Sequence, residues 1–86
     1  MAEELVGKVV KFFAKPSVAA LEVTSGSLKI GDRIRIKGHT TDFEAAITSM
    51  EIERKAIEQA GPGDTVGIKV AERVREGDLV YKIVAD

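Results

Sequence analysis

The chain has 86 residues, a length that suits one domain, and we predict a single domain over residues 1–86. Its 13 Lys and Arg are balanced by 14 Asp and Glu, which argues against a protein that coats nucleic acid by bulk electrostatics. The chain has no cysteine and one histidine, so neither disulfides nor a zinc ligand set can stabilise it.

The N-terminus begins Met-Ala-Glu-Glu and lacks the basic and apolar regions of a signal peptide. No apolar run approaches the roughly 20 residues that span a bilayer. We therefore expect a soluble, cytoplasmic protein. The charged fraction is 31%, with no Asn and a single Gln, a composition that resembles thermophile proteins.

Six strands are predicted in chain order. The first covers about residues 5–14 and is almost continuously apolar, which is typical of a strand covered on both faces or of one that bends and changes its buried face. Pro16 follows it and ends it, since proline cannot donate to a central ladder. The second strand covers about residues 18–24 and places three apolar side chains on one face: Ala19, Leu21 and Val23.

The third strand, residues 32–37, alternates most clearly. Its apolar side chains, Ile34 and Ile36, point one way, and three basic side chains point the other way: Arg33, Arg35 and Lys37. The fourth strand runs from about residue 43 to residue 53. Its apolar positions change phase at Thr48 and Ser49, which predicts a β-bulge.

The last two strands follow glycine-rich turns. The fifth is predicted to turn Val66, Ile68 and Val70 inward, and the sixth carries Leu79, Tyr81 and Ile83. Residues 54–60, which precede the fifth strand, form the one segment compatible with a helical turn before Gly61-Pro62-Gly63 stops it.

Three Gly-Asp pairs each precede a run of alternating apolar residues: Gly31-Asp32, Gly63-Asp64 and Gly77-Asp78. Glycine allows the positive φ that a tight turn needs, and aspartate can bond to nearby backbone and hold the turn. Three such turns between short strands predict an all-β fold, a small closed six-stranded antiparallel β-barrel. Closure would leave no free sheet edge.

Four stretches, in this order, resemble domain 2 of the translation GTPases, the β-barrel that follows the GTPase domain in elongation factor Tu. They are residues 26–32 (GSLKIGD), 47–55 (ITSMEIERK), 60–68 (AGPGDTVGI) and 74–80 (VREGDLV). The resemblance runs from about Val6 to Ile83 and implies the barrel fold. A similar barrel closes the C-terminus of some collagenase-like peptidases, and small free-standing copies also occur, which this chain resembles.

The chain departs from that family where function is concerned. It has no G-x-x-x-x-G-K-S/T phosphate loop, so we expect no nucleotide and no other cofactor. In the elongation factor, a Gly-Arg-Gly-type segment helps to build the pocket for the aminoacylated tRNA end, and residues 14–18 lack its glycines. Leu21 also stands where that family has a small residue. Arg54 and Lys55 match the family's basic pair.

Six side chains are candidates for contact with RNA or a partner: Arg33, Arg35, Lys37, His39, Arg54 and Lys55. Strand residues with basic side chains can position a phosphate backbone without reading sequence, or they can form a solvated outer face beside acids such as Glu22. The lone His39 lies in a predicted hairpin loop, where it is either a solvated turn residue or part of a partner contact. One of Phe12 and Phe13 must face outward in a regular strand and is a further candidate contact.

The main prediction is a non-catalytic binding module that contacts ribosomal RNA, tRNA or the ribosome through the basic strand and the loop after it. The alternative is a protein-interaction barrel that docks on a separate enzyme or self-associates. Catalysis is disfavoured because the chain has no cysteine nucleophile, no phosphate loop and one isolated histidine. A barrel of this size also fills its interior with side chains. The identity of the partner and the oligomeric state remain open at this point.

Overall fold

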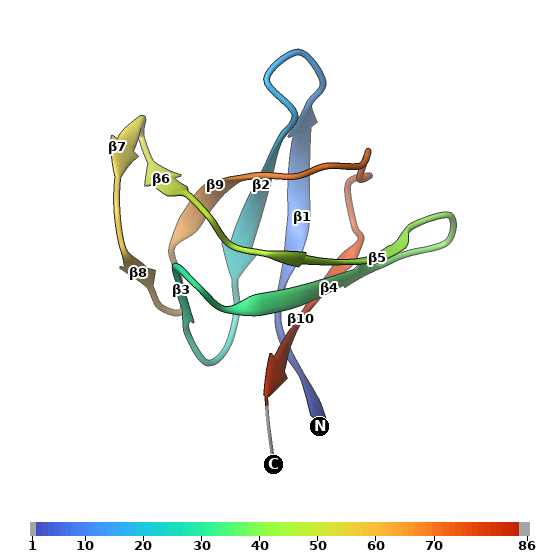
Figure 1. The fold of residues 1–86 in the computed structure, drawn as a ribbon, viewed down its shortest axis with the longest axis horizontal. Coiled ribbons are helices and arrows are strands. Elements are labelled where there is room, and N and C mark those ends of the chain that lie inside the picture. Colours follow the sequence, from blue (N-terminus) through green and yellow to red (C-terminus); the bar gives the residue numbers. More distant parts are fainter. Residues whose placement is uncertain (1, 85–86) are drawn as a thin grey trace.

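The computed structural model describes residues 2–84, which form antiparallel strands joined by turns, with no helix among them (Figure 1). None of the described residues therefore belongs to a helix that could cross a membrane. The all-β prediction is confirmed. The strands are β1 (Ala2–Phe13), β2 (Val18–Val23), β3 (Leu28–Lys29), β4 (Arg33–Lys37), β5 (Asp42–Ala46), β6 (Met50–Ile52), β7 (Lys55–Ala56), β8 (Gln59–Ala60), β9 (Thr65–Lys69) and β10 (Leu79–Val84).

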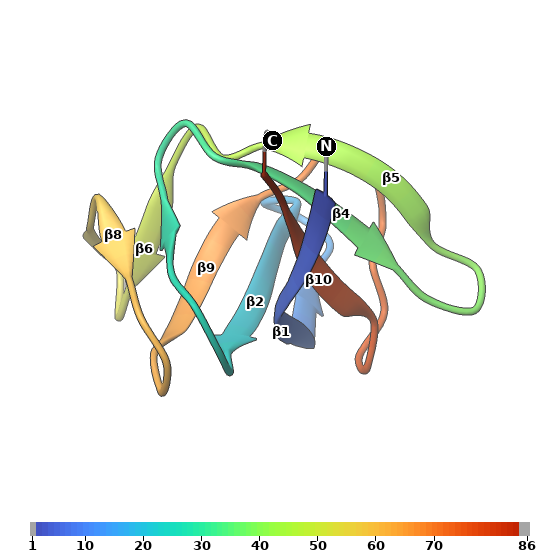
Figure 2. The ribbon, with the colours of Figure 1, turned by 90° about the horizontal axis from the view of Figure 1, so that it is seen from below.

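Eight strands form one sheet in the order β5-β4-β10-β1-β2-β9-β6-β7, and β3 pairs with β8 in a second, two-stranded sheet. The large sheet curves around the core, and the two chain ends lie side by side because Ala2 pairs with Val84 (Figure 2). Among residues 2–84 no ladder joins the end strands β5 and β7, so the sheet is curved but the predicted six-stranded closure is not seen as a continuous ladder.

The predicted fourth strand and the segment after it differ from the sequence-based expectation. Residues 43–53 divide into β5 and β6, and residues 47–49 between them belong to no strand and form no bulge. The helical turn considered for residues 54–60 is wrong, because that segment forms β7 and β8. Glu53 and Arg54 take positive φ angles of 50° and 67°, which is the backbone of a two-residue hairpin turn between β6 and β7.

The core collects side chains from every long strand. The predicted inward positions of β2, β4 and β9 are confirmed, since Ile34 and Ile36, for example, are fully buried. The phase predicted for the last strand is wrong: Val80 is fully buried, whereas Leu79 is 39% exposed. Val80 pairs with Ile36 across the β4–β10 ladder and therefore shares its core-facing side.

The long first strand bends, as one of the two sequence interpretations anticipated. Its register shifts between Leu5 and Gly7 in the ladder with β10 and between Val9 and Lys11 in the ladder with β2. Val6 and Val9 are both buried although they are three residues apart. At the first of these shifts the backbones of β1 and β2 come close together, and only glycine fits at position 7. A Cβ atom there would lie 2.2 Å from the carbonyl oxygen of Glu22.

The three Gly-Asp turns share one bonding pattern, which confirms the sequence prediction. Each aspartate accepts a hydrogen bond at Oδ2 from the backbone N–H three residues earlier, at 3.0 Å for Asp32, 3.0 Å for Asp64 and 2.9 Å for Asp78. Each also donates its own N–H to the carbonyl of that same earlier residue, at 3.1 Å. The preceding glycines have φ angles of 90° to 98°, which suit glycine alone without strain.

Candidate partner-binding surfaces

The basic face of β4 lies where the sequence placed it. Arg33 and Lys37 are exposed and Arg35 is half-buried, because the alternating Ile34 and Ile36 fill the core. Three positive side chains thus share the outer surface of one strand.

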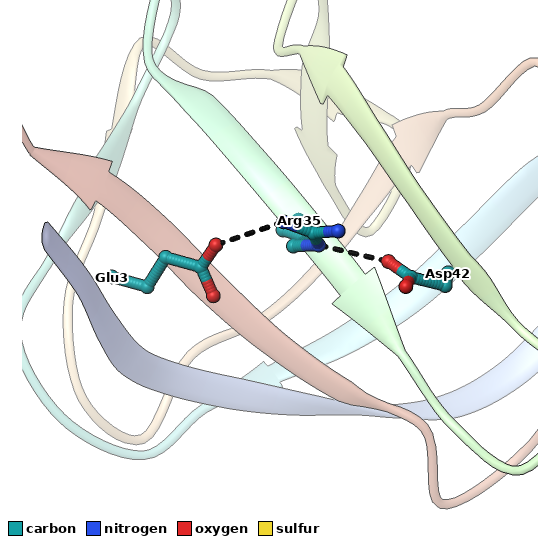
Figure 3. Close-up of polar contacts among 3 residues, drawn as sticks. All are labelled: Glu3, Arg35 and Asp42. Atoms are coloured by element: carbon teal, nitrogen blue, oxygen red, sulfur yellow. Dashed lines mark hydrogen bonds and ion pairs between the residues drawn. The ribbon is translucent and has the colours of Figure 1, made fainter. Parts of the chain in front are cut away.

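The central member of this face is neutralised by its neighbours. Arg35 donates from Nε to Oδ1 of Asp42 at 2.8 Å and from Nη1 to Oε2 of Glu3 at 3.1 Å (Figure 3). The hydrogen bond from Arg35 lowers the pKa of Asp42, and the bonds to Asp42 and then Glu3 raise the pKa of Arg35 above its already high value. The two carboxylates thus take up two of the five N–H donors of the guanidinium and offset its charge.

The remaining candidates lie in two separate places. His39 is exposed in the loop of the β4–β5 hairpin, two residues after Lys37 at one end of the basic face. Arg54 and Lys55 are exposed at the β6–β7 turn, at the opposite end of the molecule from that hairpin (Figure 1). The structure therefore groups Arg33, Arg35, Lys37 and His39, and it does not bring Arg54 and Lys55 to them.

One hollow beside the β1–β2 hairpin is apolar, with a volume of about 550 Å³. Phe13 is one of its lining residues and is 43% exposed, so it is the outward-facing phenylalanine that the sequence required. The Lys11 Nζ lies 5.1 Å from its ring centroid. Val18, Ala20 and Gly67 also line the hollow and alternate with the core positions of β2 and β9. The sequence did not reveal these lining residues, because they are small and come from separate strands.

A second hollow, of about 460 Å³, lies between β5 and the end of β9. We call it the β5 seam, and its lining residues are Glu44, Ala45, Ala46, Thr48, Lys69, Val70 and Ala71. The only sequence signal for it was the change of phase at Thr48 and Ser49. No group of three or more His, Cys, Asp or Glu among residues 2–84 is arranged to hold a metal ion.

Comparison with known proteins accounts for this architecture. The family model described as elongation factor G domain 2 matches residues 5–83. The chain belongs to the elongation factor G domain 2 family. Consistent with this, an elongation factor 1-alpha of Pyrobaculum islandicum is 35% identical over 71 residues, which are 78% of this chain and 16% of that protein.

Other relatives of this domain are named as proteases. An uncharacterized protease of Methanocaldococcus jannaschii is 48% identical over 77 residues, 88% of this chain and 19% of that protein. A collagenase of Porphyromonas gingivalis is 38% identical over 78 residues, 90% of this chain and 22% of that protein. The domain thus spans about a fifth of the length of these relatives.

Solved structures show the same fold at low sequence identity. The C-terminal domain of a Geobacillus thermoleovorans protein assigned to the U32 peptidases superposes with a TM-score of 0.86 at 19% identity, covering 94% of this chain and 93% of that one. GDP-bound aIF5B, a translation GTPase of Aeropyrum pernix, gives a TM-score of 0.65 at 19% identity over 96% of this chain and 14% of the other.

Proposed function

We propose that this domain is a protein-interaction module that docks on the catalytic part of a peptidase. The proposal rests on one observation: similar domains occur within proteins that are named as peptidases. A protease and a collagenase share 48% and 38% of the aligned residues, and an isolated peptidase C-terminal domain matches nearly end to end. In this proposal the domain positions or stabilises a catalytic region and performs no chemistry of its own.

The electrostatics of the surface favour a protein over RNA as the partner. Binding to a phosphate backbone depends on free Lys and Arg side chains that release counterions. The central arginine of the basic face, Arg35, is held by two carboxylates, and Arg54 and Lys55 lie at the far end of the molecule. The formal net charge of −1 adds no general attraction to RNA.

The exposed apolar side chains also favour a protein partner. Phe13 is 43% exposed beside the apolar hollow, and Val10 on the same strand is 37% exposed. Protein–protein interfaces are built from such aromatic and aliphatic side chains with a polar rim. Glu51, Glu53 and Arg54 supply polar side chains around this hollow.

The proposal is tested with a relative in which the matching segment can be removed. The Methanocaldococcus jannaschii protease is prepared without the 77 residues that align with this chain, and circular dichroism first establishes that the remainder is folded. Titration calorimetry then measures its binding to the 86-residue chain. We expect a one-to-one complex that survives ribonuclease and 0.5 M salt. Salt at that concentration screens charge–charge attraction beyond a Debye length of about 4–5 Å, but it does not weaken apolar contacts in this way.

The competing outcome is tested in parallel. The domain is mixed with tRNA and with ribosomes at low and high salt. Binding to either that falls steeply with salt, together with no binding to the folded protease remainder, would overturn the proposal and restore the RNA-binding prediction. The predicted cytoplasmic location plays no part in either measurement and stays a prediction.

A further inference from the structure

We propose that the free edge of β5 takes up an extended segment of the partner by strand addition, and that this segment alternates basic and apolar side chains. The inference rests on the proposed function and specifies its contact. It is argued from the backbone of β5, from the room beside it and from the charge of its side chains.

The backbone groups that point away from β4 belong to alternate residues of β5. Thr41 accepts a hydrogen bond from the N–H of Gly38, and Ile47 donates to the carbonyl of Asp32, so odd-numbered residues bond toward β4. The register continues this alternation, with Phe43 opposite Ile36 and Ala45 opposite Ile34. In an antiparallel ladder the intervening residues direct both N–H and C=O the other way. The outward groups therefore belong to Asp42, Glu44 and Ala46.

These outward groups have no strand partner among residues 2–84, because β5 is an end strand of the sheet. The ladder between β6 and β9 reaches Met50↔Ile68 and Glu51↔Gly67 and then stops. Beyond that point no ladder joins β5 to the described chain after β9, and residues from both line the β5 seam. The seam is an open depression of about 460 Å³ along this edge, and an added strand would enter it about 4.8 Å from β5.

The side chains of β5 define the chemistry of the added strand. Asp42, Glu44 and Ala46 are exposed on the outer face, whereas Phe43 and Ala45 are half-buried on the inner face. A paired strand places its side chains about 5 Å from those opposite them on the same face. Basic side chains would thus lie beside Asp42 and Glu44, and apolar ones would cover Phe43 and Ala45.

Glu44 supplies this complementarity, in a seam that Lys69 also lines and beside Arg35, its opposite residue on β4. Asp42 is already paired with Arg35, whereas Glu44 has no ion-pair partner among the described residues. The same charge disfavours a second copy of this chain as the occupant. The self-paired register centred on Glu44 would place two Glu44 carboxylates opposite each other, which is destabilising.

The probe is a heptapeptide with lysine at alternating positions and valine between them, capped at both ends. Amide hydrogen exchange of the isotope-labelled 86-residue chain is followed by NMR with and without the peptide. Strand addition should slow exchange at Glu44 and Ala46 by about tenfold or more and leave the amides of Phe43 and Ala45, already bonded to β4, nearly unchanged. Glu44→Arg should weaken peptide binding by about tenfold.

Two controls separate a specific contact from general charge attraction. Glu58→Arg makes the same change of charge between β7 and β8, at the other end of the molecule (Figure 1), and should bind the lysine peptide as the native chain does. A peptide with glutamate in place of lysine should bind the Glu44→Arg variant better than the native chain. Equal weakening by Glu44→Arg and Glu58→Arg, or no slowing at Glu44 and Ala46, would overturn the inference.

The remaining outcomes distinguish this inference from the proposed function. If the protease remainder binds the native chain and the Glu44→Arg variant equally, the edge is not the contact, and the docking function stands without it. If the lysine peptide protects the edge but the protease remainder does not bind, the edge site stands and the peptidase proposal falls. Protection that grows with protein concentration in the absence of peptide would assign the edge to a second copy and overturn the inference.

Discussion

β5 and β6 belong to one strand in the sequence-based prediction but have different surroundings in the fold. β5 has five paired residues along β4 and no partner on its other side among residues 2–84. β6 is shorter and pairs on both sides, with β9 and with β7. The difference shows that the open edge of this domain arises where a single run of sequence changes partners.

Two buried side chains hold the chain on either side of this change. Ile47 is 2% exposed and Met50 is 1% exposed, and the residues between them are exposed and unpaired. Ile47 also accepts a hydrogen bond from the N–H of Gly31 and donates one to the carbonyl of Asp32. The position of the open edge therefore depends on where these two side chains enter the core.

The largest expected effect comes from removing one of these anchors. Ile47→Ala deletes buried methyl and methylene groups and leaves a cavity, so the free energy of unfolding should fall by about 2–4 kcal/mol. The total free energy of unfolding of a domain of this size is roughly 4–13 kcal/mol, so urea denaturation will resolve a loss of this size. The same substitution at its exposed neighbour, Thr48→Ala, should change the free energy of unfolding by less than about 0.5 kcal/mol. Equal effects at the two positions would show that Ile47 is not an anchor.

A smaller effect is expected where the β4–β5 hairpin meets the last Gly-Asp turn. A Cβ atom at Gly38 would lie 1.9 Å from Oδ1 of Asp78, a carboxylate that is only 5% exposed. Gly38→Ala should therefore force the turn to shift and lower the free energy of unfolding by about 1–3 kcal/mol. Gly61→Ala is the matched control, because a Cβ atom there meets nothing within 4 Å. A neutral Gly38→Ala would mean that the hairpin moves freely past Asp78.

Local chemistry explains why the turns and the clearest strands could be predicted. The Gly-Asp turns depend on a positive φ and on a carboxylate bonded three residues back, both of which are written in adjacent residues. The alternation in β4 likewise needs only the period of two, and Ile34 and Ile36 are buried as it requires. These features involve no choice of distant partner.

The remaining features depend on distant partners, which a pattern cannot name. The run of Leu79, Val80 and Tyr81 is apolar in both phases, and only the register with β4 selects Val80 for the core. The basic face of β4 was predicted, but the carboxylate that pairs with Arg35 from β1, Glu3, lies 32 residues away in the chain. The β5 seam was missed for the same reason, since it exists only where one ladder stops and another continues.

The smallest expected effect concerns the ion pair between Arg35 on β4 and Asp42 on β5. Among residues 2–84, no residue of β6 forms an ion pair of this kind. Arg35 lowers the pKa of Asp42 from its ordinary value of 3.8. A carboxyl group whose pKa is lowered on folding stabilises the folded state at pH values above its ordinary pKa. This stabilisation is lost as the pH falls through the folded-state pKa. Asp42→Asn should thus lower Tm slightly at pH 7, and the difference from the native chain should narrow below about pH 4.

Thermal unfolding followed by circular dichroism from pH 7 to pH 2.5 measures this difference directly. Glu44→Gln is the matched control on the same strand, because Glu44 has no ion pair among residues 2–84, and it should lower Tm at pH 7 less than Asp42→Asn does. A constant difference for Asp42→Asn would mean that solvent and salt screen its pair with Arg35 completely. In that case Glu3 would remain the partner of Arg35, and the ion pair between β4 and β5 would contribute nothing measurable to the stability of the domain.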